Sequence, residues 1–186
     1  MRKNFGAKPF MYPLPVLVIA TYNEDGSANA MNAAWGTIAD HDKIALFLSA
    51  KHKTVANILN KKAFTVAMAD QKNLEAADFV GIVSGNNLKE KLDKTHWILS
   101  KSDFVDAPVI EQLPMTLECK LISYDEQLEL LIGEIINVAA AEEVLDDLGQ
   151  IDPEKLELIS YDPVNKKYLK LGAKAGNAFK DGILLE

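Results

Sequence analysis

Short apolar runs that end in turn-forming residues recur along this chain, and they constrain its fold more than any other feature. Residues 16–21 are apolar and rich in β-branched side chains, and residues 23–26 end in a glycine, which tolerates a positive φ. Residues 28–38 then return as a second strand, and residues 43–48 form a third. This order predicts an antiparallel meander.

Two segments change to a helical period. Residues 54–62 place apolar side chains on one helical face and end in lysines, which predicts a short helix. Residues 73–83 are also predicted to be helical, with Gly85 as the stop. Strand character returns between the two helices, over residues 63–69.

The second half of the chain alternates again. Residues 114–124 and 128–141 are two long predicted strands joined by residues 125–127, which makes a second hairpin. Residues 89–106 are polar and give no assignment, and residues 151–186 are predicted to be loops around short strands.

About seven short strands with irregularly inserted helices argue against a doubly wound sheet and for a β-barrel with helical excursions. The expected fold class is therefore mainly β with helical insertions (β or α+β). The chain has 186 residues, 48% of them hydrophobic, which is enough to bury one core. A single domain over residues 1–186 is the expectation.

Charge and cysteine content exclude several classes of protein. With 27 acidic and 20 basic residues the net charge is −7, which predicts no nucleic-acid partner and no anionic membrane surface. Cys119 is the only cysteine, so neither a disulfide framework nor a cysteine metal site can form. The apolar stretch near the N-terminus is broken by prolines and does not form a signal peptide. A cytoplasmic protein is expected.

Residues 49–54 bring basic and hydroxyl groups together between a predicted strand and a predicted helix. They include Ser49, Lys51, His52, Lys53 and Thr54. Free N–H groups at a helix start, the helix dipole and two lysines are the parts of a phosphate site, and Thr54 could cap the helix or bind a phosphate oxygen. A solvated basic loop is the alternative, and it stays open.

Residues 29–36 form an unusual strand of alanines and asparagines, which buries little surface and has poor β-propensity. Small side chains let a planar ring approach the backbone, and a tryptophan can wall the pocket. The residues expected at such a ring are Asn29, Ala30, Met31, Asn32, Ala33 and Trp35. Close packing of this strand on a helix or another subunit is the alternative.

Other catalytic and binding signals are weak. Ser84 and Gly85 by themselves indicate a helix end, and His41 and His96 have no second ligand at metal spacing, which speaks against a metal site. The glycine-rich segments match neither a Rossmann fingerprint nor a P-loop. No catalytic side chain is predicted.

The sequence resembles the flavin reductase-like proteins with an FMN-binding split barrel, and within them the flavoredoxin group. The resemblance rests on the order and spacing of several segments, namely residues 6–8, 12–16, 29–31 with 33–36, 63–66, 76–85, 106–108, 117–121 and 132–135, and the ending near residues 178–179. It covers most of the chain.

The resemblance implies that the FMN ring lies along residues 29–35 and its phosphate near residues 49–54, with an edge near Ser84, Gly85 and Lys91. It also implies a homodimer in which the flavin lies near the subunit boundary and C-terminal segments serve the partner's site. Two departures matter. Residues 128–131 lack the histidine that related chains often carry, and Thr37 replaces an expected glycine. Both departures concern a polar contact to the flavin and, through it, reductase activity.

The function expected from this resemblance is an NAD(P)H-dependent flavin reductase, in which NADH or NADPH passes a hydride to flavin N5. One alternative is a flavoredoxin-like module that keeps FMN and exchanges electrons with a redox protein partner. Another is a flavin-free barrel with a binding or structural role. A related barrel that uses pyridoxal phosphate or a deazaflavin fits the phosphate loop but not the resemblance.

Overall fold

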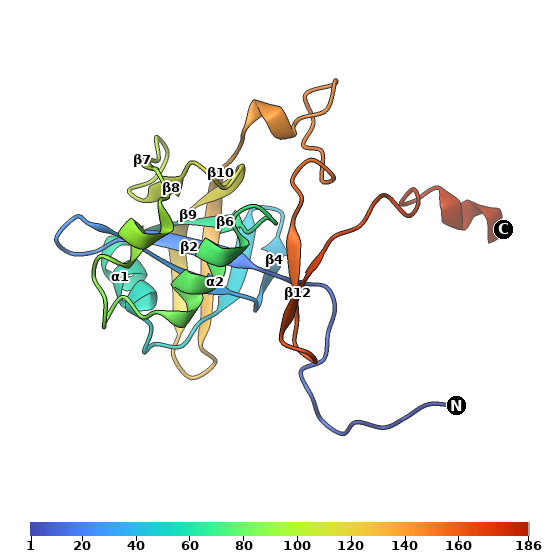
Figure 1. Cartoon of the computed structure of the whole chain (residues 1–186), viewed down its shortest axis with the longest axis horizontal. Helices are drawn as coiled ribbons and strands as arrows, with labels where there is room; N and C mark the ends of the chain where they lie inside the picture. Colours follow the sequence, from blue (N-terminus) through green and yellow to red (C-terminus); the bar gives the residue numbers. More distant parts are fainter. Residues whose placement is uncertain (186) are drawn as a thin grey trace.

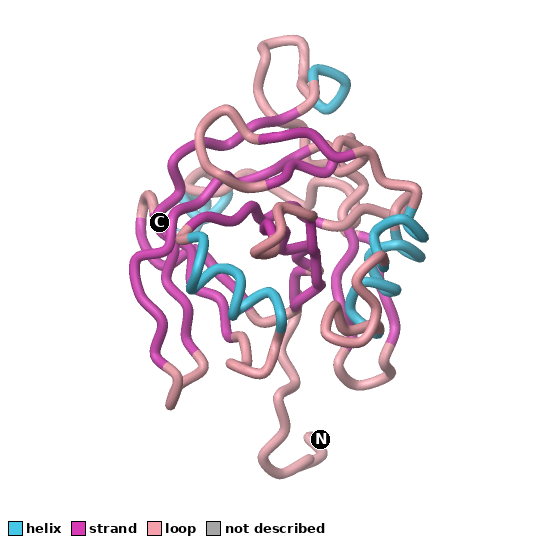
Figure 2. The backbone as a smooth tube through the Cα atoms, turned by 90° about the vertical axis from the view of Figure 1, so that its left-hand side faces the viewer, coloured by secondary structure: helices cyan, strands magenta, loops and turns pink. Residues whose placement is uncertain are grey.

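The computed structural model describes residues 1–185, and its centre is a seven-stranded antiparallel sheet. The strand order is β3-β2-β6-β9-β10-β5-β4. Figure 2 shows the strands curling into an incomplete ring. The strands are β2 (Leu17–Tyr22), β3 (Ala28–Ala33), β4 (Gly36–Asp40), β5 (Lys43–Phe47), β6 (Ala63–Met68), β9 (Met115–Asp125) and β10 (Leu130–Ala140). The expected class, mainly β with helical insertions, is confirmed.

The prediction of one strand over residues 28–38 is wrong. β3 ends at Ala33 and pairs with β2, whereas β4 starts at Gly36 and pairs with β5. These two pairs lie at opposite edges of the sheet, so the chain crosses its open side at Ala34 and Trp35. A Cβ on Gly36 would lie 2.6 Å from a side-chain carbon of Leu17, so only glycine fits where the two edges approach.

Both predicted hairpins are confirmed. β2 and β3 pair from Leu17↔Ala33 to Tyr22↔Ala28, and Gly26 in their turn has a φ of 85°. β9 and β10 pair antiparallel over most of their length, with two register shifts. The backbone N–H groups of Gln127 and Leu128 both donate to the Asp125 carboxylate, which closes the second turn.

Two helices pack into two separate cores of the curled sheet. The first, α1 (Lys53–Lys61), packs Val55 and Ile58 into one core with the apolar side chains of β5, β6 and β9. The second, α2 (Leu74–Ile82), packs Ala77 and Val80 into the other core. Alternate residues of β2 belong to alternate cores, which is why that strand is apolar from Leu17 to Ala20.

The helix ends differ from those expected. His52, not Thr54, is the N-cap of α1, and Thr54 lies inside the first turn. Helix α2 ends at Ile82 with Val83 as its C-cap, before Gly85 is reached. Within the unassigned region lie the 3-10 helix η1 (Lys91–Thr95) and the strand β7 (Leu99–Lys101), which pairs with β8 (Pro108–Ile110).

The C-terminal part folds back on the start of the chain. β11 (Ile159–Asp162) pairs with β1 (Leu14–Pro15) on one side and with β12 (Lys167–Lys170) on the other. Two short 3-10 helices, η2 (Glu142–Val144) and η3 (Asp181–Leu185), complete the described elements. In Figure 1 the segments before β1 and after β12 extend away from the sheet. No helix of residues 1–185 is long and apolar enough to cross a membrane.

Candidate functional site

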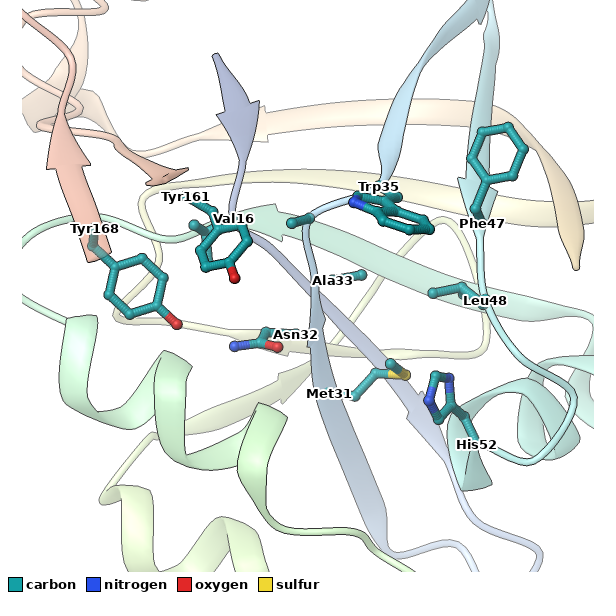
Figure 3. A pocket seen from close by; sticks show the side chains of 11 residues that line it. Val16, Met31, Asn32, Ala33, Trp35, Phe47, Leu48, His52, Tyr161 and Tyr168 are labelled. Carbon is teal, nitrogen blue, oxygen red and sulfur yellow. The ribbon is translucent and has the colours of Figure 1, made fainter. Parts of the chain in front are cut away.

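A cavity of about 320 Å³ lies against β3 (Figure 3). Five parts of the fold meet there: the start of β2, strand β3 with the crossing that follows it, the end of β5, the start of α1, and the hairpin β11–β12. Its lining residues are Val16, Met31, Asn32, Ala33, Ala34, Trp35, Phe47, Leu48, His52, Tyr161 and Tyr168. Aromatic and small apolar side chains therefore predominate.

The structure brings four of the six residues expected at a planar ring into this cavity, namely Met31, Asn32, Ala33 and Trp35. Ala30 does not line it, because its side chain is fully buried in the core beside α2. Asn29 does not line it either, and the residue is 3% exposed.

Asn29 instead joins the strand to the basic loop. Its Nδ2 donates a 2.8 Å hydrogen bond to Oγ1 of Thr54, and both side chains are buried. The two predicted binding segments, residues 29–35 and 49–54, are thus held in a fixed relation by one polar contact. A buried hydrogen bond of this kind fixes the local geometry, because a buried donor or acceptor without a partner costs free energy.

The basic loop has the groups of an anion site. Lys51 and His52 are exposed and Lys53 is half-buried, and neither lysine forms a salt bridge with any described residue. No backbone hydrogen bond within residues 1–185 uses the N–H groups of Lys53 or Thr54. The first turn of α1 has no acidic residue. An anion at this helix start would meet free donors, the positive end of the dipole and two ammonium groups.

A second loop lies beside the first. The Asn86 amide donates to the carbonyl oxygen of Lys51 at 3.4 Å, and the Ser84 hydroxyl accepts a hydrogen bond from the Asn86 N–H. A Cβ on Gly85 would lie 2.3 Å from Oδ1 of Asn29, so this position requires glycine for close packing. Ser84 and Gly85 therefore lie at the basic loop, outside the cavity lining.

Lys91 occupies a different environment from the one expected. It is 2% exposed and its Nζ donates to the carbonyl oxygens of Val80, at 3.0 Å, and Val83, at 2.8 Å. Burial lowers the pKa of Lys91 to about 8. These carbonyl groups lie at the C-terminal end of α2, so Lys91 supplies hydrogen-bond donors that the helix itself does not provide there. It does not line the cavity.

Two tyrosines of the C-terminal hairpin complete the cavity, and sequence analysis missed both. Tyr161 is on β11 and Tyr168 is on β12. The Tyr168 hydroxyl donates a 2.6 Å hydrogen bond to Oδ1 of Asp78 on α2, and burial followed by this hydrogen bond raises the pKa of Tyr168. Nothing local in the sequence marks them, because the pairing that brings them to β3 joins residues about 146 apart in sequence.

A larger apolar groove of about 920 Å³ adjoins the cavity. It is lined by the N-terminal segment and by β2, β4, β6 and β9, and it shares Ala34, Trp35 and Phe47 with the smaller cavity. Phe10, Met11 and Ile38 in this groove are exposed.

The residues present fit FMN. Ala33 and Ala34 are small lining residues between Met31 and Trp35, which leaves room for a planar ring, and the start of α1 offers N–H groups and cations for a phosphate. Other redox or metal sites lack support: among residues 1–185 no three His, Cys, Asp or Glu side chains are placed to hold a metal ion. Cys119 is buried, and burial raises the pKa of its thiol to about 12, which keeps it unreactive.

Comparisons with known proteins agree with this geometry. The model of the flavin reductase like domain matches residues 10–156. The flavoredoxin of Desulfovibrio vulgaris (Miyazaki F) is 33% identical, with 98% of this chain and 100% of that chain covered and a TM-score of 0.93. The flavoredoxin from Methanosarcina acetivorans is 26% identical, with both chains fully covered and a TM-score of 0.88.

A third structure supports the fold alone. It is the FMN-binding domain of a flavin reductases-like enzyme from Shewanella baltica OS155, 23% identical over 88% of each chain, with a TM-score of 0.78. The predicted split-barrel fold and the resemblance stated from sequence are both confirmed. The matched family region ends at residue 156, before the hairpin that carries Tyr161 and Tyr168.

Proposed function

Because this chain belongs to the flavin reductase-like domain family, whose members are oxidoreductases, we propose that it is an NAD(P)H-dependent flavin reductase that holds FMN in the β3 cavity. The single observation that carries the proposal is the placement of a small-residue, aromatic-walled cavity directly beside an unpaired cationic helix start. An apolar planar ring and a dianionic phosphate on one molecule need those two environments side by side.

In the proposed complex the chain binds and orients the cofactor. Met31, Ala33 and Trp35 contact the ring, and Lys51, Lys53 and the free N–H groups of α1 hold the phosphate. The hydrogen bond between Asn29 and Thr54 keeps the two ends at a fixed spacing. Bound FMN supplies the redox chemistry, because its ring accepts a hydride from a reduced nicotinamide.

Trp35 and Phe47 define the access side of the cavity. Their side chains are 55% and 46% exposed, and they line both the cavity and the adjoining groove. A second planar molecule can therefore approach from this side and stack in line with the first. In Figure 3 His52 lies below Trp35 and Phe47, near Met31, where the basic loop meets the cavity.

The test is anaerobic reduction of the FMN-loaded protein by NADH and by NADPH, followed by absorbance. Loss of the flavin bands within seconds with either donor supports the reductase. If the protein retains FMN and neither donor bleaches its flavin bands, the reductase proposal is wrong and a role in electron transfer remains.

Electron carriage is the second candidate, and the two flavoredoxin structures favour it, because they are 33% and 26% identical to this chain over nearly its whole length. In that role the chain keeps FMN and trades electrons with a redox protein. Slow turnover with free nicotinamides, together with rapid reduction by a reduced ferredoxin or cytochrome, would select it over the reductase.

We also propose that the chain works in the cytoplasm as a homodimer. The 920 Å³ groove exposes Phe10, Met11 and Ile38 next to the cavity, and a second copy covering it would bury apolar surface that a monomer leaves in water. Light scattering of the wild type and of Ile38→Asp tests this: the wild type should be dimeric and the variant monomeric. A wild-type monomer would refute the dimer, and cell fractionation tests the compartment.

A further inference from the structure

The hairpin β11–β12 is a wall of the cavity that lies outside the matched family region. Several contacts attach it to the body, among them a 3.1 Å hydrogen bond from the Ile159 N–H to the Ala69 carbonyl oxygen. β11 pairs with β1, Tyr12 donates a hydrogen bond to Asp162, and Tyr168 donates one to Asp78 on α2. This wall is therefore held from both sides of the cavity, and side chains on it have defined positions.

The two tyrosines of the hairpin differ in their hydrogen bonding. The Tyr168 hydroxyl donates its hydrogen bond to Asp78, whereas the Tyr161 hydroxyl makes no hydrogen bond to any described residue. The two rings lie 6.2 Å apart with an angle of 56° between them, so Tyr168 supports the ring of Tyr161. Figure 3 shows the Tyr161 hydroxyl pointing into the cavity toward Asn32.

Asn32 is fixed as well. Its Nδ2 donates to the carbonyl oxygen of Ala77 at 2.8 Å, and its side chain packs so closely on Gly81 that a Cβ there would lie 2.1 Å from Oδ1. The Asn32 amide therefore cannot rotate freely to meet a ligand. Tyr161 is left as a half-buried side chain with a free O–H donor at this end of the cavity.

This end lies away from the basic loop, because His52 and Tyr161 stand on opposite sides of the cavity in Figure 3. With the phosphate at the loop, Tyr161 faces the ring. We propose, on the basis of the proposed FMN site, that the Tyr161 hydroxyl donates a hydrogen bond to the polar edge of the flavin ring. Through this bond the protein binds the reduced, anionic cofactor more tightly than the oxidised one. Hydrogen bonds to a charged acceptor are stronger than those to a neutral one.

The experiment compares Tyr161→Phe with Tyr22→Phe and the wild type. Tyr22 is the matched control: it is also half-buried, its hydroxyl makes no hydrogen bond to a described residue, and it lies outside the cavity. The readouts are the midpoint potential of bound FMN and the dissociation constants of oxidised and reduced FMN. Tyr161→Phe should weaken binding of reduced FMN about tenfold, the scale of one hydrogen bond to a charged group.

Affinity for oxidised FMN should change less than about threefold, so linkage requires the midpoint potential of Tyr161→Phe to shift downward. Tyr22→Phe should match the wild type in all three quantities. A potential for Tyr161→Phe equal to that of the wild type, or equal losses of affinity in both redox states, would overturn the role of Tyr161 while the FMN site stands. A wild type that binds no FMN would instead refute the proposed function.

Discussion

Lysines that were expected to bind the flavin lie at the start of α1 and, in η1, against the end of α2, and the structure gives them opposite surroundings. Lys51 and Lys53 stand at a helix N-terminus, without a salt bridge to any described residue. Lys91 is buried against a helix C-terminus, where its ammonium donates to two carbonyl oxygens.

Helix polarity explains the difference. The C-terminal end of a helix is negative, so its free carbonyl oxygens accept the hydrogen bonds of Lys91 and no ligand is needed there. The N-terminal end of a helix is positive, so the two lysines at the start of α1 are repelled by that end and by each other. A bound anion would compensate this repulsion. Charged residues in an electrostatically unfavourable position indicate a binding site, because a ligand can compensate their charge. Charged residues whose hydrogen bonds are all made within the protein indicate a structural role.

The largest expected effect tests the structural half of this comparison. Lys91→Met removes both hydrogen bonds to the end of α2 and leaves buried carbonyls without a donor. We expect a loss of about 2 kcal/mol in the free energy of unfolding, measured by urea denaturation. Lys94→Met, an exposed neighbour in the same 3-10 helix, should change stability by less than about 0.5 kcal/mol. Equal effects of the two variants would contradict a capping role for Lys91.

The next effect tests the binding half. Replacing Lys51 and Lys53 with alanine should weaken FMN binding by at least about tenfold, since each lysine can make a charge-assisted contact to phosphate. Stability should be unchanged, because neither ammonium has a salt bridge to a described residue. The control is Lys61→Ala with Lys62→Ala, which removes the same charge from the far end of α1. If fluorescence titrations show equal losses for both pairs, net charge and not the loop holds FMN.

The pKa of Lys91 gives a smaller, pH-dependent effect. Burial lowers this pKa from 10.5 to about 8, so between these values the unfolded chain holds more protons than the folded one. Stability from this group therefore rises with pH across that window and is constant below it. The stability gap between wild type and Lys91→Met should widen by about 1 kcal/mol from pH 8 to pH 9. A gap that stays constant over this range would mean that the carbonyls keep Lys91 charged.

The smallest expected effect concerns a carboxylate near the basic loop. Hydrogen bonds from Ser27, followed by the charges of Lys89 and Lys53, lower the pKa of Asp25. Asp25 thus competes weakly with a phosphate for Lys53. Asp25→Asn should tighten FMN binding by no more than about twofold at low salt, because exposed charges interact weakly. Weaker binding in this variant would show that Asp25 orders the loop for FMN.

Much of the fold could be predicted from local patterns. Both hairpins and both helices follow from alternation, helical period and turn residues, with ends shifted by a few residues. The break after Ala33 could not be predicted, because alanine and asparagine carry no strand signal and Gly36 acquires its role only when Leu17 and Leu46 close around it.

The candidate site, like the fold, could be predicted from the sequence only in part. Residues 31–35, which line the cavity, and residues 49–54, of which His52 lines it, could be selected from the sequence because each segment has an unusual composition for its place in the chain. Tyr161 and Tyr168 were missed because their position depends on a pairing between the two ends of the chain. Lys91 was expected at the flavin edge from the family resemblance alone, and the sequence does not show that its ammonium meets the carbonyl oxygens at the end of α2.

Comparing the affinities of FMN and riboflavin for the wild type and for the Lys51→Ala, Lys53→Ala variant tests the central claim most directly, since the two ligands share the ring and differ in the phosphate. The account predicts that the wild type binds FMN at least about tenfold more tightly than riboflavin, and that this ratio falls toward one in the variant. Equal affinities in the wild type, or an unchanged ratio in the variant, would contradict the assignment of the phosphate to the start of α1.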